Sequence, residues 1–252
     1  MQFLKCIIVF FCTMHAVCLL APAQPKVVDS LKQLLQNTTA DSSRIILQYK
    51  IAGALAGYDM AASGKYLEAG HSLALAANDH RYTAYYFLLR GNLLFDMDKY
   101  EEALKYYDSA MVVYTRLIRE EKNAAEKENY INSKTDCLIG KGLSSAKVYQ
   151  YQESIKYYLE AIAVLESLNN SKKNTYLATL YADIASDYYE LEQFADALKF
   201  DKLGLLYLDS NKSIERYVIG NLFVADDFGA LLQFDSSSRY LETVRPIVLQ
   251  LN

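Results

Sequence analysis

The sequence KYEEALKYYDSAM at residues 99–111 decides the fold, because QYQESIKYYLEAI at residues 150–162 echoes it position by position. Weaker copies begin at residues 65, 193 and 233. One aromatic residue marks each copy, and the five markers are Tyr66, Tyr100, Tyr151, Phe194 and Phe234. Copies spaced a few tens of residues apart are typical of repeat architectures, in which each unit buries its apolar face against the next.

The repeated unit has the pattern of two packed helices. Ala103, Tyr107 and Ala110 are spaced i, i+4 and i+7, which places them on one face of a helix, and Phe87 and Gly91 begin the same spacing in the preceding segment. Small residues opposite large ones let two helices pack closely. With 3 Pro and 10 Gly in 252 residues, the chain also lacks the turn residues of β-hairpins. The sequence predicts an all-α protein.

This order of large and small residues resembles the tetratricopeptide repeat family, whose period is 34 residues. The interval between Tyr66 and Tyr100 equals that period, and the interval of 51 between Tyr100 and Tyr151 predicts a longer helical hairpin. Arg90 and Lys141 depart from the family pattern, which has aliphatic residues there. The resemblance implies a right-handed superhelix (α-solenoid) of about five antiparallel helix pairs, with repeats near 50–78, 84–122, 124–168, 174–209 and 213–252.

Residues 1–23 have the layout of a secretory signal peptide. Lys5 precedes an uncharged, largely apolar run at residues 6–20, which is too short for a permanent membrane helix, and Ala21-Pro22-Ala23 is a cleavage site. We therefore expect cleavage after Ala23 and export of a soluble chain to the periplasm or the medium. Residues 24–40 are predicted to form a capping helix, and residues 41–252 the repeat domain.

The sequence offers no catalytic constellation. His71 and His80 lack partners at metal-ligand spacing, and Cys137 is the single cysteine after the signal, so no intramolecular disulfide is expected. No phosphate loop or nucleophile elbow occurs. We interpret the protein as having no enzymatic activity, metal or cofactor. Its mixed charges, with a formal net charge of −4, disfavour nucleic acid as a partner.

The family resemblance also implies that the first helix of each repeat lines an inner groove. The matching positions are mostly aromatic or neutral, and they are Tyr58, Tyr85, Leu88, Asn92, Phe95, Leu143, Ser186, Tyr189 and Asp226. Aromatic side chains supply a large contact area at low conformational cost. We therefore predict that the groove binds an apolar or amphipathic segment of a peptide or protein partner.

These features predict an exported adaptor for protein–protein interaction, similar to exported tetratricopeptide proteins of Bacteroidetes-like bacteria. The alternative is an extracytoplasmic sensor module of a tetratricopeptide-containing regulator, of which this chain would be a part. Near the end of the chain, Val244, Ile247, Val248 and Leu251 form an apolar stripe. We expect a second copy of the chain, in a homodimer, or a downstream segment to cover it.

Overall fold

The computed structural model describes residues 24–168, 173–208 and 213–251, so the predicted signal peptide lies outside the described residues. Within these ranges all regular structure is helical. The helices are α2 (Gln24–Gln36), α3 (Asp41–Leu55), α4 (Met60–Ala76), α5 (His80–Asp96), α6 (Tyr100–Glu120), α7 (Ala124–Lys147), α8 (Tyr151–Ser167), α9 (Lys173–Glu190), α10 (Phe194–Leu205), α11 (Ile214–Ala230) and α12 (Phe234–Leu251).

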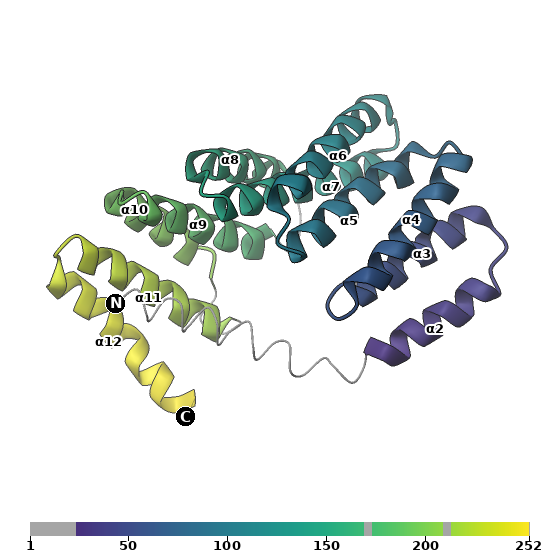
Figure 1. Cartoon of the computed structure of the whole chain (residues 1–252). Helices are drawn as coiled ribbons and strands as arrows, with labels where there is room; N and C mark the ends of the chain where they lie inside the picture. Colours follow the sequence, from purple (N-terminus) through teal and green to yellow (C-terminus); the bar gives the residue numbers. More distant parts are fainter. Residues whose placement is uncertain (1–23, 169–172, 209–212, 252) are drawn as a thin grey trace.

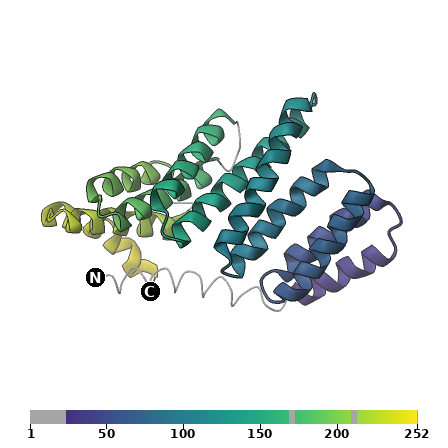
Figure 2. The same ribbon diagram turned by 45° about the horizontal axis from the view of Figure 1, so that its top comes forward.

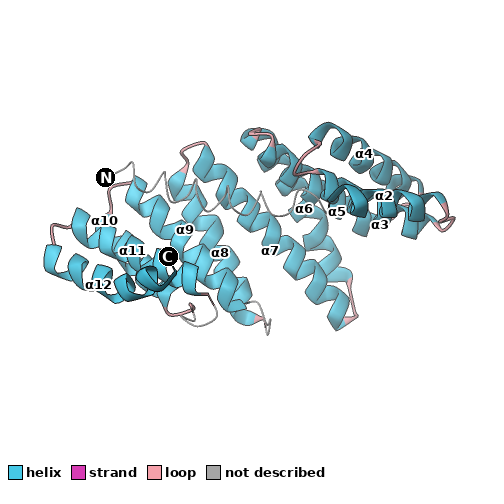
Figure 3. Ribbon diagram, turned by 90° about the horizontal axis from the view of Figure 1, so that it is seen from below, coloured by secondary structure: helices cyan, strands magenta, loops and turns pink. Residues whose placement is uncertain are grey.

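The helices form five antiparallel pairs that follow one another in chain order (Figure 1). The pairs are α3–α4, α5–α6, α7–α8, α9–α10 and α11–α12, and α2 packs on α3 at one end. Seen from below, the pairs continue along the length of the molecule (Figure 3). The predicted all-α solenoid of about five helix pairs is therefore confirmed.

Tyrosine rings packed on glycines bring neighbouring helices together. A Cβ atom added to Gly91 of α5 or to Gly140 of α7 would lie 2.6 or 2.5 Å from the ring of Tyr107, which belongs to α6. One ring thus fills the space that two missing side chains leave, and it joins the second pair to the third. Tyr158 packs on Gly142 in the same way. These contacts explain the large-and-small pattern of the sequence.

The turns inside the second to fifth pairs share one geometry. Each has a non-glycine residue with positive φ two positions before the next helix, namely Asp98, Tyr149, Glu192 and Leu232. In the first of these turns the Lys99 amide donates to the Leu94 carbonyl oxygen at 2.8 Å. This is the hydrogen bond of a Schellman motif, which satisfies the last carbonyl groups of a helix. The common turn geometry fixes where the second helix of each pair begins.

The first pair differs from its predicted register. The second helices begin at the expected markers Tyr100, Tyr151, Phe194 and Phe234, but α4 begins at Met60 rather than near Tyr66. The Asp59 carboxylate caps α4 by accepting a hydrogen bond from the Ala62 amide at 2.9 Å, and this cap sets the start of the helix. Pair one consequently spans residues 41–76 and begins ahead of the expected repeat near 50–78. The second helices of the first two pairs begin at Met60 and Tyr100, 40 residues apart, rather than at the 34-residue interval between Tyr66 and Tyr100.

The interval of 51 residues between two markers lengthens α6 to 21 residues and α7 to 24. Their shared hairpin projects from the solenoid (Figure 2). Tyr114 and Tyr130 pack together near its tip, with ring centroids 6.4 Å apart. The side chain of Asn123 caps α7 by accepting a hydrogen bond from the Ala125 amide at 3.0 Å. The hairpin therefore has its own cap, and its two tyrosines extend the core of the second and third pairs toward the tip.

Two departures from the family pattern form ion pairs between successive helix pairs. Arg90 and Lys141 occupy the same position in the second and third pairs. The Arg90 guanidinium lies 3.9 Å from the Glu68 carboxylate of α4, and the Lys141 ammonium lies 2.6 Å from the Asp108 carboxylate of α6. Lys141 also lies 4.1 Å from the centroid of the Tyr157 ring. Both cations thus replace an apolar contact with a polar junction.

The apolar stripe of α12 is only partly exposed. Val244 is buried against the rest of the protein, whereas Val248 is 39% exposed. The side chain of Leu251 lies outside the described residues. Leu241 and Leu249, beside the predicted stripe, are 44% and 68% exposed. The last helix therefore packs through one face and presents other apolar side chains to solvent.

Candidate functional site

A cleft of about 530 Å³ lies between the first helices of the second and third pairs. Its size is within the usual range of binding sites. Most of the lining comes from α5 and α7, with one residue each from α6 and α9. The lining residues are Tyr85, Leu88, Leu89, Asn92, Phe95, Asp96, Tyr107, Asp136, Ile139, Gly140, Leu143 and Tyr176.

The structure brings five of the nine predicted groove residues together in this cleft. They are Tyr85, Leu88, Asn92, Phe95 and Leu143. Leu88 is buried and belongs to the floor, whereas Tyr85 is 40% exposed and offers part of its ring to solvent. The cleft thus combines an apolar floor with accessible aromatic and amide groups.

The other four predicted residues lie elsewhere. Ser186 and Tyr189 belong to α9 and Asp226 to α11, and they do not line the first cleft. Burial, followed by the neighbouring Asp226 carboxylate, raises the pKa of Tyr189, so these two residues are close together. Tyr58 lies in the turn between α3 and α4, because the register of the first pair differs from the predicted one.

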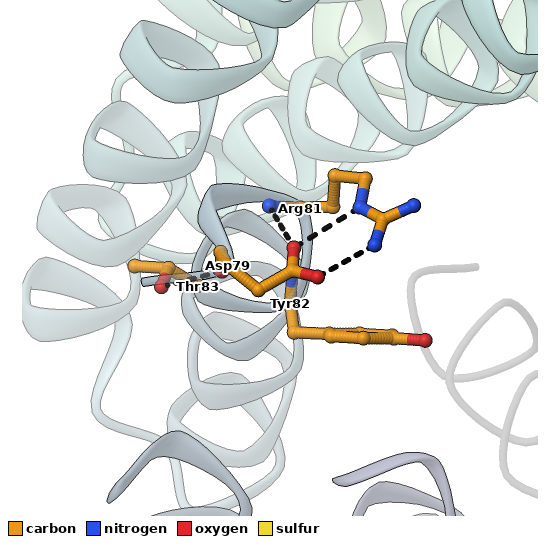
Figure 4. A network of polar contacts seen from close by, with 4 residues as sticks. All are labelled: Asp79, Arg81, Tyr82 and Thr83. Carbon is orange, nitrogen blue, oxygen red and sulfur yellow. Dashed lines mark hydrogen bonds and ion pairs between the residues drawn. The ribbon is translucent and has the colours of Figure 1, made fainter. Parts of the chain in front are cut away.

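The start of α5 is held by a polar network around Asp79 (Figure 4). The Asp79 carboxylate accepts hydrogen bonds from the Arg81 amide at 3.0 Å and from the Arg81 guanidinium at 3.1 and 2.6 Å. The Thr83 hydroxyl donates to the Asp79 carbonyl oxygen at 3.1 Å. The hydrogen bond from Arg81 holds the pKa of Asp79 below its usual range. This charged cap fixes the helix that supplies half of the cleft.

Asn92 is oriented from below. The Tyr107 hydroxyl, which lies in the floor, donates a hydrogen bond to Asn92 Oδ1 at 2.9 Å, and burial raises the pKa of Tyr107. Because Asn92 Oδ1 accepts the hydrogen bond from Tyr107, the amide N–H groups of the exposed Asn92 side chain can donate to an acceptor in the cleft.

Sequence reasoning missed two carboxylates in the cleft, Asp96 and Asp136. Among the described residues, no hydrogen bond or ion pair joins either one to a partner. Asp136 still reaches solvent, but surrounding protein atoms remove part of its hydration and raise its pKa to about 6. A signal for it existed: Asp136 follows Tyr85 by the 51 residues that separate Tyr100 from Tyr151.

A second, smaller cleft of about 260 Å³ lies between α9 and α11. Its lining includes Asp183, Ile219 and Phe223, and also Arg216. Burial, and then the negative charge of Asp187, raise the pKa of Asp183 to about 7. A cleft between first helices therefore recurs in the fourth and fifth pairs, but its lining contains both a carboxylate and a guanidinium.

The described residues contain no group of three or more His, Cys, Asp or Glu side chains that could hold a metal ion. None of the helices in the described ranges is long and apolar enough to cross a membrane.

Cys137 is buried, and burial raises the pKa of its thiol. A neutral, inaccessible thiol is a poor nucleophile.

Comparison with known proteins identifies the repeat. A family model described as tetratricopeptide repeat matches residues 83–118, which cover most of α5 and α6. A search of curated protein sequences finds no match.

Three solved structures show the breadth of the similarity. The first is a Signal Transduction ATPase with Numerous Domains protein with a tetratricopeptide repeat sensor from Pyrococcus horikoshii, with a TM-score of 0.76 and 14% identity over 94% of this chain and 35% of that one. The second is BtubC from P. vanneervenii, with a TM-score of 0.72 and 13% identity over 91% of this chain and 90% of that one. The third is NprR in complex with its cognate peptide NprX, with a TM-score of 0.56 and 16% identity over 87% of this chain and 59% of that one.

Identities this low show the fold alone, and this chain spans about a third of the Pyrococcus protein. The family model, however, matches the second helix pair directly, and the same architecture extends over the other four. Residues 83–118 therefore match a tetratricopeptide repeat, and the described helix pairs together have the fold of tetratricopeptide repeat proteins.

Proposed function

We propose that the protein is an exported adaptor that holds a segment of a peptide or protein partner in the cleft between α5 and α7, and that it performs no catalysis. The observation that carries this proposal is the convergence of Tyr85, Asn92, Phe95 and Leu143 on one cleft of about 530 Å³. Aromatic and aliphatic walls suit apolar side chains of a ligand. The amide N–H groups of Asn92 can donate a hydrogen bond to a backbone carbonyl group of the ligand.

Two neighbours support binding as the role of this fold. The solved NprR structure holds a cognate peptide, and the Pyrococcus protein carries its tetratricopeptide repeats as a sensor. Both similarities support protein or peptide binding as the function.

The proposed export rests on residues 1–23. It is tested by sequencing the N-terminus of the protein recovered from the envelope fraction or the medium of the source cells. A first residue other than Gln24 would contradict cleavage after Ala23.

The second candidate function is a sensor module within a longer regulator, which the Pyrococcus neighbour favours. An immunoblot of the source cells separates the two candidates. A band near the 28.6 kDa of this chain, or slightly smaller after signal cleavage, supports the adaptor. A much larger band supports the sensor.

The cleft is tested by affinity purification from an envelope extract, followed by quantitative mass spectrometry. Replacement of Tyr85 and Phe95 by Ala removes two of the aromatic rings that line the cleft, and we expect the recovery of the wild-type partners to fall at least tenfold. Tyr149→Ala with Phe234→Ala is the matched control, since both aromatics are exposed and outside the cleft. Equal recovery by the wild type and the Tyr85/Phe95 variant would refute binding in the cleft.

We also propose that α12 mediates a homodimer through Leu241 and Leu249, which are exposed apolar residues on the last helix. Light scattering of the purified protein should give twice the monomer mass, and Leu241→Ser with Leu249→Ser should give the monomer. Leu206→Ser is the control, because Leu206 is 76% exposed but lies after α10. A monomeric wild type at micromolar concentration would contradict this contact.

A further inference from the structure

The charges in the first cleft all have one sign. Asp96 and Asp136 line it, and no Lys or Arg does. Neither carboxylate has a hydrogen bond or ion pair within the part of the chain that the structure describes. A carboxylate that has lost part of its hydration is stabilised when a cation approaches it. The second cleft is different, because Arg216 already lines it beside Asp183.

One of the two carboxylates, Asp136, lies beside an aromatic ring. Asp136 lies close enough to Tyr85 to raise the pKa of that phenol, in addition to the effect of burial. Asp96 follows Phe95 directly at the end of α5. A Lys or Arg side chain has an apolar stem and a charged head, so it can lie along a ring and reach a carboxylate beyond it. Tyr85 and Asp136 offer that combination.

We propose that the bound segment is basic: it places a Lys or Arg side chain along Tyr85 with its cationic head at Asp136, an apolar residue on Leu88 and Leu143, and a second basic residue toward Asp96 at the far end of α5. This inference rests on the proposed function and gives the partner its chemistry. It also changes the prediction from sequence, in which the groove was almost uncharged. An acidic segment is disfavoured, because two unpaired carboxylates repel it.

The test pans a random dodecapeptide library, displayed on phage, against the purified protein. We expect the selected peptides to contain at least three times the Lys and Arg content of the input library, next to aliphatic or aromatic residues. The Asp96→Asn/Asp136→Asn variant should lose this enrichment while it still selects apolar peptides. Glu128→Gln with Glu160→Gln is the matched control, since it removes two exposed carboxylates outside the cleft.

The strongest selected peptide is then synthesised in two forms, with its basic residues intact or replaced by Gln. We expect the basic form to bind at least tenfold more tightly at low salt, and the Asp96/Asp136 variant to weaken that form alone. If the selected peptides are neutral or acidic, and their binding is lost in the Tyr85/Phe95 variant, the cleft binds peptides but the basic partner is wrong. If that variant binds them unchanged, or no peptide is selected, both proposals fall.

Discussion

Gly91 and Gly140 leave the space that the ring of Tyr107 occupies. A Cβ atom at either position would come within 2.6 Å of that ring. We expect Gly91→Ala to displace Tyr107, weaken its hydrogen bond to Asn92, and lower the free energy of unfolding by about 1–3 kcal/mol. Urea denaturation measures this change. Gly53→Ala is the control, since nothing lies within 4 Å of a Cβ atom there. It should be neutral or stabilising, by up to about 1 kcal/mol, because alanine favours the helix.

Asp183 makes the stability of the protein depend on pH. Its pKa is about 7 in the folded protein, mainly because of burial, against 3.8 for an ordinary Asp. Between these values the folded state binds more protons than the unfolded state, so stability falls as pH rises from about 4 to about 7. Asp183→Asn removes this loss.

We expect Asp183→Asn to unfold at higher urea concentration than the wild type at pH 8, with a gain of about 1–3 kcal/mol after allowance for residual solvent contact. Near pH 4 the two proteins should be equally stable. Glu160→Gln on the exposed face of α8 should change neither curve. A constant difference from pH 4 to pH 8 would exclude the titration of Asp183 as its cause.

At the scale of elements, Lys141 joins α7 to α6 through a buried cation. Its side chain is 10% exposed, whereas the side chain of its partner Asp108 is 60% exposed. Loss of either partner should therefore have unequal effects, since a buried Lys141 would be left without a carboxylate, with only Tyr157 beside it, whereas Asp108 is exposed. We expect Asp108→Ala to destabilise the protein by about 1–3 kcal/mol. Lys141→Met should change stability by less than about 1 kcal/mol, because Asp108 can turn to water. Thermal unfolding of both variants checks the order, and a larger loss in Lys141→Met would contradict it.

The start of each element was predictable where a strong marker coincides with a turn. Tyr100, Tyr151, Phe194 and Phe234 each begin a helix, because the same Schellman-type turn precedes them. Tyr66 carries a similar local sequence but lies inside α4, whose start is set by the Asp59 cap. The start of α4 therefore follows the Asp59 cap and not the sequence similarity that begins at residue 65.

That error in register also explains part of the candidate site. Tyr58 was placed in the groove by the 34-residue period and falls in a turn instead. Asp136 was missed, although it occupies the position in the third pair that Tyr85 occupies in the second, 51 residues earlier. The raised pKa of Asp136 could not be read from the sequence, since it depends on atoms of other helices that surround the carboxylate.

At the scale of the whole molecule, each helix pair contacts mainly its neighbours in the chain. The stability of such an array is approximately a sum over pairs and their junctions. We expect deletion of residues 213–252, which contain α11 and α12, to leave the remaining pairs folded. The urea m-value should fall roughly in proportion to the lost surface. Circular dichroism and denaturation measure both properties, and complete unfolding would show that the last pair is required by all others.

The position of Tyr107 has a mechanical consequence. Its ring is held between glycines of two successive pairs, forms part of the cleft floor, and orients Asn92 through its hydroxyl. A change in the angle between those pairs must move the ring, and with it the floor and the amide. If the cleft binds the proposed ligand, we therefore expect curvature of the solenoid and occupancy of the cleft to be coupled, so that a force that straightens the array would also change the affinity for the ligand.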